Sequence, residues 1–133
     1  MLEHLLTELC EKLELPLDLE KDKKDYYSLS LTDEISFSLR ELSPGFFLRA
    51  ELGEAPEGSY EDLYILLMKA NFLGQGTAGA FIGMDEKAEN FTLTKACKHE
   101  TSYREFKEFL EEFVNYFEYW KKRIDTYIKA NSS

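Results

Sequence analysis

The chain has 133 residues, a formal net charge of −10 and a hydrophobic fraction of 44%. This length suits one domain spanning residues 1–133, and the hydrophobic fraction is too high for a disordered chain. The excess of carboxylates repels polyanions, which argues against direct binding to nucleic acid or to an anionic membrane. No apolar run approaches the roughly 20 residues of a membrane-spanning helix, so we expect no membrane insertion.

The first half of the sequence changes from a helical period to a strand period. Leucines recur at spacings of three and four over residues 2–13, which predicts an amphipathic helix. Apolar residues then alternate with serines, which predicts antiparallel strands over residues 27–31 and 35–39. Ser43-Pro44-Gly45 has the chemistry of a turn, and a third strand is expected over residues 46–52.

A second helix is predicted after the meander. Ser59 stands three residues before Asp62, an arrangement similar to a capping box, and apolar residues follow with a helical period. The helix is expected to end near Phe72, with Gly74 as its left-handed C-terminal cap. A short hairpin is then predicted from strands at residues 80–84 and 91–95.

The last predicted element is a long helix opened by a true capping box, Ser102-x-x-Glu105. Acidic residues crowd its first half and basic residues its second half, which complements the helix dipole at the two ends. The basic cluster could be a partner site or a solvated face. The element order is α-β-β-β-α-β-β-α, which predicts an α+β fold with a twisted antiparallel sheet packed by helices.

The string GQGTAG at residues 74–79 matches the G-x-G-x-x-G pattern of dinucleotide-binding loops. Such a loop needs a strand before it and a helix after it, so that the helix N-terminus meets the pyrophosphate. Here the predicted order is reversed, which argues against nucleotide binding. We interpret these glycines as a helix stop and a turn that leads into a strand.

No other pattern in the sequence indicates an enzyme. The two histidines lie far apart in sequence and give no metal-ligand spacing, and no nucleophile motif occurs. Cys10 and Cys97 form no C-x-x-C pair; two reduced thiols are expected, with a disulfide left open. We therefore predict a non-enzymatic protein with no cofactor and no metal.

One stretch, from Ala70 to Glu86, resembles the signature region of class I type III secretion chaperones. In that family a helix ends in Ala-Asn, as at Ala70-Asn71, and a turn rich in glycine and threonine follows. A short apolar strand then ends in Gly-x-Asp-Glu, as at Gly83-Met84-Asp85-Glu86. The small acidic chain and the predicted element order agree with the same family.

The resemblance implies a dimeric chaperone in the bacterial cytoplasm. Members bind the N-terminal segment of a secreted effector in extended form, and they keep it soluble and secretion-competent without ATP. The chain most resembles members that form a heterodimer with a second chaperone, although a homodimer is equally open. The chain is most similar to a member of this heterodimeric kind that also binds RNA polymerase and modulates transcription, and we keep this role as an alternative function.

The resemblance also suggests two sets of binding residues. An extended client can add a strand to a sheet edge and place alternate side chains in apolar pockets. The candidates for client binding on the first helix and the sheet are Leu2, Leu5, Leu9, Phe37, Phe47 and Phe91. The second helix is the usual dimer element of the family, so the interface candidates are Leu63, Leu66, Leu67 and Met68. For each residue the alternative is a place in the core of the chain itself.

Overall fold

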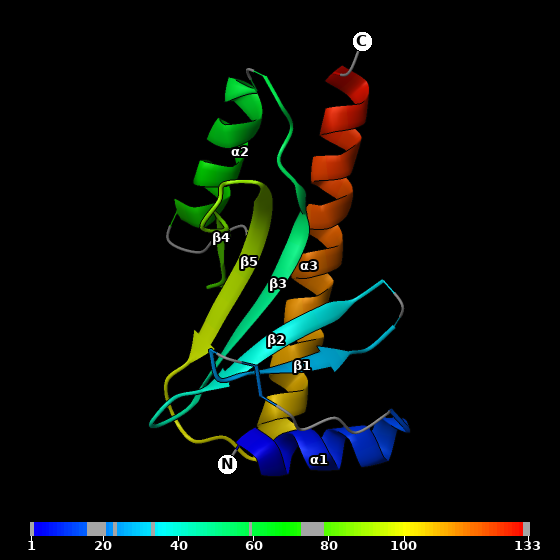
Figure 1. Cartoon of the computed structure of the whole chain (residues 1–133), viewed down its shortest axis with the longest axis vertical. Helices are drawn as coiled ribbons and strands as arrows, with labels where there is room; N and C mark the ends of the chain where they lie inside the picture. Colours follow the sequence, from blue (N-terminus) through cyan, green and yellow to red (C-terminus); the bar gives the residue numbers. More distant parts are fainter. Residues whose placement is uncertain are drawn as a thin grey trace.

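The computed structural model describes residues 2–15, 21–22, 24–32, 34–58, 60–72 and 79–131. The helices and strands follow the predicted order, and the α+β architecture is confirmed (Figure 1). In chain order they are α1 (Leu2–Leu13), β1 (Tyr26–Ser30), β2 (Ser36–Glu41), β3 (Phe46–Glu54), α2 (Glu61–Asn71), β4 (Phe81–Met84), β5 (Asn90–Cys97) and α3 (Tyr103–Asn131).

The five strands form one antiparallel sheet in the order β1-β2-β3-β5-β4. The meander β1–β2–β3 supplies one part, and the β4–β5 hairpin joins it through pairing of β5 with β3. Strands β1 and β4 are therefore the two edges of the sheet. Because side chains alternate between faces, residues paired across strands share a face, as Leu39 does with Leu48.

Helix α3 packs against one face of the sheet and α1 packs against α3, and their buried side chains form the core (Figure 1). Aromatic rings join the layers edge to face, an arrangement that stabilises a pair beyond simple burial. Phe37 of β2 meets Phe113 and Phe117 of α3, with ring centroids 5.4 and 5.9 Å apart. Phe46 of β3 meets Phe106 in the same way at 5.2 Å. The buried aromatic side chains of α3 thus pack against the sheet.

The other face of the sheet is turned away from α3, and Figure 1 views the strands β1, β2 and β3 from this side. We name it the open face. The strand register decides which side chains lie side by side on this face: Ser28 pairs with Ser38, and Ser38 pairs with Arg49. The serines that alternate with apolar residues in β1 and β2 lie on this face, while the apolar residues between them are buried on the other.

The capping box predicted for α3 is confirmed. The Glu105 amide donates to Ser102 Oγ at 3.2 Å, and the Ser102 amide donates to Glu105 Oε1 at 3.4 Å. The prediction for α2 is wrong in detail, because its N-cap residue is Tyr60 and makes no side-chain capping bond. Ser59 and Gly74, the predicted cap residues of that helix, lie outside the described residues.

Gly45 is required by a close backbone approach at the β2–β3 turn. Its φ is +98°, and a Cβ atom at this position would lie 1.9 Å from the carbonyl oxygen of Cys97. The turn predicted at Ser43-Pro44-Gly45 therefore also presses against the end of β5. Among the described residues, none of the helices is long and apolar enough to cross a membrane.

Candidate functional site

The Ala-Asn pair of the signature region joins α2 to the edge strand β4. The Asn71 side-chain amide donates from Nδ2 to the Ile82 carbonyl at 2.7 Å, and the Ile82 amide donates to Asn71 Oδ1 at 2.7 Å. Ala70 beside it is buried in the core. Two short hydrogen bonds between one side chain and one backbone position fix the end of the helix against the strand.

The aspartate of the signature closes the turn between β4 and β5. Asp85 Oδ1 accepts from the amides of Glu89 at 2.9 Å and Asn90 at 3.3 Å, and Oδ2 accepts from Asn90 Nδ2 at 2.8 Å. These bonds, first that from the Asn90 side chain and then that from the Glu89 backbone, hold the pKa of Asp85 below its usual value. Its carboxylate therefore shapes a hairpin and is not poised for acid–base chemistry.

The glycine string stands in the order that argues against a dinucleotide loop. Helix α2 precedes it, and the next element in the described residues is strand β4. Residues 74–78 lie outside the described residues, while Gly79 adopts a φ of +86° just before β4. Within the described part of the chain, no group of three or more His, Cys, Asp or Glu residues is arranged to hold a metal ion.

An apolar stripe lies on the outer side of α2. Ile65, Met68 and Phe72 are exposed by 48%, 72% and 65%. Met68 follows Ile65 by three residues and Phe72 follows Met68 by four, so the three side chains lie on one face of the helix. Phe81 on the edge strand β4 is also exposed. We name Ile65, Met68 and Phe72 the α2 stripe. Apolar side chains grouped on one face in this way are typical of surfaces that bind other proteins.

The predicted interface candidates are divided by the fold. Leu63 and Leu67 are buried in the core, Leu66 is half-buried and Met68 is exposed. Ile65 and Phe72 were not among the predicted interface residues, because the prediction followed the leucines of the helix and Met68. Counting three residues back and four forward from Met68 would have found both.

A groove of about 750 Å³ runs between α2 and α3 beside this stripe. Leu66 and Lys69 line it from α2, and Tyr119, Trp120 and Arg123 line it from α3. The Arg123 guanidinium lies over the rings of Tyr119 and Trp120, at 5.9 and 5.6 Å from their centroids. The groove thus combines aromatic surface with two cations in a chain that is acidic as a whole.

Most of the client-binding candidates lie inside the molecule. The buried ones are Leu2, Leu5, Leu9, Phe37 and Phe91. Phe47 is half-buried on the open face, where its ring meets that of Tyr26 at 6.3 Å. Leu9 also lines a mainly apolar groove of about 430 Å³ between α1 and α3, together with Leu13, which is exposed by 46%.

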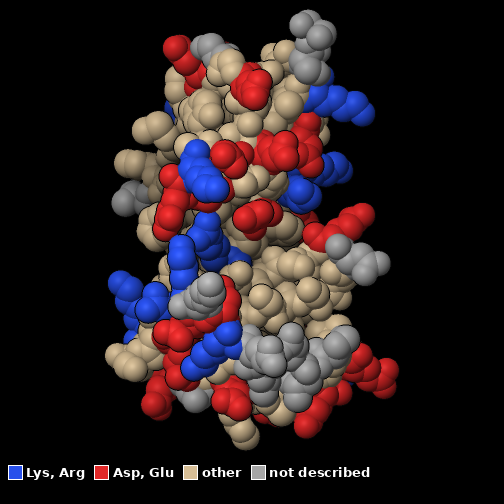
Figure 2. All heavy atoms as spheres, viewed as in Figure 1, with Lys and Arg blue, Asp and Glu red and all other residues tan. Residues whose placement is uncertain are grey.

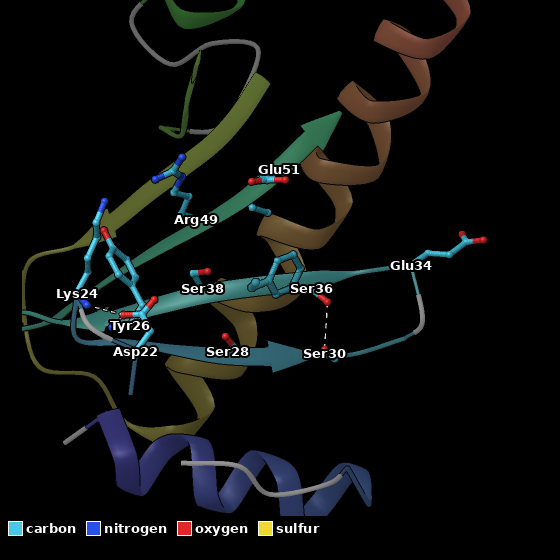
Figure 3. A pocket seen from close by; sticks show the side chains of 12 residues that line it. Asp22, Lys24, Tyr26, Ser28, Ser30, Glu34, Ser36, Ser38, Arg49 and Glu51 are labelled. Carbon is cyan, nitrogen blue, oxygen red and sulfur yellow. Dashed lines mark hydrogen bonds between the residues drawn. The ribbon is translucent and has the colours of Figure 1, made fainter. Parts of the chain in front are cut away.

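The open face carries a shallow hollow of about 670 Å³ over β1, β2 and β3 (Figure 3). Its floor is made of small side chains that the strand register places together: Ser28, Ser30, Ser36 and Ser38. Tyr26, Lys24 and Arg49 stand at one end, and Glu34 and Glu51 lie toward the other. A floor of serines leaves room for the larger side chains of a bound segment.

Charged side chains frame this hollow. Figure 2 shows lysine and arginine side chains gathered on the left of the same face, beside an area of uncharged surface to their right. Lys24 and Arg49 are among the residues that line the hollow, and Asp22 lies next to Lys24. The face therefore offers hydroxyl groups, aromatic rings and both signs of charge to a peptide.

The two cysteines are buried free thiols, as expected from the sequence. Burial raises the pKa of the Cys10 thiol, so this side chain is protonated at neutral pH. Cys97 Sγ lies 3.6 Å from His99 Nε2 at the end of β5. Cys10 serves as a small apolar residue in the core.

Three solved structures share the fold of this chain. The ExsC–ExsE complex contains a chain that matches with a TM-score of 0.73 and 19% identity, covering 91% of both chains. The HopA1–SchA chaperone–effector complex matches with a TM-score of 0.70 and 15% identity, over 90% of this chain and 92% of that one. The heterodimeric ExoU–SpcU complex of the Pseudomonas aeruginosa type III secretion system matches with a TM-score of 0.65 and 16% identity, over 92% and 93%.

Sequence comparison gives the family. A Chlamydia pneumoniae protein is 26% identical over 122 residues, which cover 90% of this chain and 93% of that protein. The model of the Tir chaperone protein (CesT) family matches residues 4–121. Together with the fold and the signature residues Asn71 and Asp85, this match shows that the chain belongs to the Tir chaperone protein (CesT) family.

Proposed function

We propose that the protein is a type III secretion chaperone that binds the N-terminal segment of a secreted effector and keeps it soluble and secretion-competent. The observation that carries this function is the family match over residues 4–121. Membership of a chaperone family also agrees with the prediction of a non-enzymatic protein. The fold is shared with a chain of a chaperone–effector complex.

Two surfaces are suited to an extended client. The hollow of the open face has small serines on its floor and Tyr26 at one end, and the ring of Phe47 lies against that of Tyr26. The groove between α1 and α3 is lined mainly by apolar side chains, including the exposed Leu13. A disordered segment can cover both surfaces at modest affinity per unit area, because it wraps around a folded protein. Their combination supports binding of an unfolded segment that alternates polar and apolar side chains.

The experiment is an affinity purification of the protein from its native cell, with the bound proteins identified. We expect a secreted protein bound through its N-terminal segment, and the double variant Tyr26→Ala/Phe47→Ala should retain less of it. The matched control is Tyr119→Ala on α3, which removes an exposed ring outside the two client surfaces. Capture of no secreted protein by the unmodified chain would contradict the proposed function.

We propose that the α2 stripe is the dimer interface. Ile65, Met68 and Phe72 supply apolar side chains that a partner would cover. The partner is a second copy or a second chaperone of the same family. Light scattering of the protein alone, and then of the protein co-expressed with other chaperones of its cell, tests this interface. A chain that stays monomeric in both settings would contradict it.

RNA polymerase is a further proposed partner, and it rests on the resemblance and on the acidic charge. A cationic surface on the polymerase would be attracted by the net charge of −10. Co-purification of polymerase subunits at low salt would support this role, and their clean absence would refute it. The same proposal places the protein in the bacterial cytoplasm, where effectors, the polymerase and a partner chaperone are all present.

A further inference from the structure

The two edges of the sheet differ in which backbone groups they leave open. In an antiparallel sheet, every second residue of an edge strand directs both its N–H and its C=O outward. The Asp85 amide donates to the Asn90 carbonyl at 3.0 Å, so within β4 the outward residues are Ile82 and Met84. The Leu31 amide donates to the Ile35 carbonyl at 3.0 Å, which makes Tyr26, Ser28 and Ser30 the outward residues of β1.

On β4 a side chain forms hydrogen bonds with the outward backbone groups at the middle of the edge. Both outward groups of Ile82 are bonded to the carboxamide of Asn71, each at 2.7 Å. A carboxamide has the same donor and acceptor as a peptide unit, so Asn71 takes the place of one residue of an added strand. β4 has only four residues, so among the described residues Met84 is the one outward position of this strand without such a cap. One outward residue is too few to pair with an added strand.

On β1 the cap covers only the start of the strand. The Asp22 amide donates to the Tyr26 carbonyl at 2.9 Å, and the Tyr26 amide donates to Asp22 Oδ1 at 3.0 Å. Ser28 and Ser30 follow, and among the described residues their outward backbone groups bond to no segment beyond the edge. Two successive outward residues offer two donors and two acceptors to an added strand. They also adjoin the hollow of the open face.

We propose that Asn71 is an edge cap that closes β4 to strand addition and thereby directs an added strand to Ser28 and Ser30 on β1. The identity of that strand as an effector segment rests on the proposed function. Asn71 acts as a positioning residue, because it decides which edge is open and does not itself contact the client. Removing its carboxamide opens a second edge, which allows addition at β4 and edge-to-edge association of two chains.

The first test follows amide hydrogen exchange at single residues. In the unmodified protein we expect the Ile82 amide to exchange more slowly than the Met84 amide, although both lie on an edge. In Asn71→Leu the Ile82 amide should exchange at least about fivefold faster, as expected for the loss of one hydrogen bond. Asn115→Leu on α3 is the matched control and should leave this rate unchanged. Equal rates for Ile82 and Met84 in the unmodified protein would overturn the proposal.

Asn71→Asp is a second variant in case the leucine variant does not fold. The carboxylate still accepts from the Ile82 amide but cannot donate to the Ile82 carbonyl, so the cap is half lost. We expect this variant to capture a strand on β4 while the Ile82 amide stays partly protected. The comparison with the unmodified protein remains informative even if both variants fail to fold.

The second test uses an octapeptide of alternating valine and threonine with a photoreactive benzoylphenylalanine at its centre. Cross-links should map to β1 in the unmodified protein, and to both β1 and β4 in Asn71→Leu and Asn71→Asp. Cross-links to β4 in the unmodified protein, or none to β1, would overturn the proposal. Neither test contains an effector, so failure to find an effector in the cell would refute the proposed function and leave these results intact.

Discussion

Truncation of Met68 to alanine should weaken a dimer formed through the α2 stripe. Full burial of a methionine side chain contributes about 1.5–3 kcal/mol. Met68 is 72% exposed in the single chain, so a partner that covers it gains about 1–2 kcal/mol per copy. A symmetric dimer buries Met68 from both copies, so the substitution makes the free energy of association less favourable by about 2–4 kcal/mol in total. This corresponds to a dissociation constant raised roughly 30- to 700-fold.

Sedimentation equilibrium of Met68→Ala and of the unmodified protein measures this change. The stability of the single chain should shift by no more than about 0.5 kcal/mol, because the side chain is already in water. Leu13→Ala on α1 is the matched control, since it removes another exposed apolar side chain far from α2 in sequence. If Met68→Ala forms a dimer with a dissociation constant within twofold of the original, the α2 stripe is not the interface.

Three further predictions concern the scaffold. Gly45→Ala should lower the free energy of unfolding by about 3 kcal/mol or more, because its φ is +98° and its Cβ would lie 1.9 Å from the Cys97 carbonyl oxygen; an unchanged urea midpoint would contradict this. Ser102→Ala should cost about 1 kcal/mol, seen as a melting temperature about 4 °C lower, and an unchanged melting temperature would show that the cap contributes nothing. The lowered pKa of Asp85 means that its contribution to stability is present above the unfolded-state pKa and is lost as the pH falls through the folded-state pKa. Asp85→Asn should therefore flatten the acid limb of stability measured by urea unfolding at a series of pH values, and an identical acid limb would refute that linkage.

Periodicity was enough to predict the elements of this fold, because local patterns decide them. Leucine spacing, serine alternation and the Ser102 capping box identified α1, the meander and α3. The end of β5 was missed: the strand runs to Cys97, because Cys97 pairs with Phe46 of β3. Such pairing joins residues far apart in the chain, and no local pattern reveals it. The N-terminus of α2 was misplaced because the helix begins without a side-chain cap.

The binding surfaces could be predicted only in part. The sequence placed apolar residues on α2, but it could not say that Leu63 faces the core while Ile65 faces solvent. That division depends on how α2 packs against β5, where the ring of Tyr64 meets that of Phe91 at 5.7 Å. Likewise, the alternating serines could be read from the sequence as polar strand positions. The hollow that they form with Arg49 could not, because it arises from the register of three strands.

The bonds of Asn71 and Asp85 have a consequence for how relatives of this protein are recognised. Both side chains are occupied with the backbone of their own chain, one at Ile82 and the other at Glu89 and Asn90. A search that finds relatives through these residues therefore selects a shared scaffold and carries no information about cargo. Under the proposed function, two proteins with the same signature can bind unrelated effectors, because the client would contact side chains outside the signature, such as Tyr26 and Phe47.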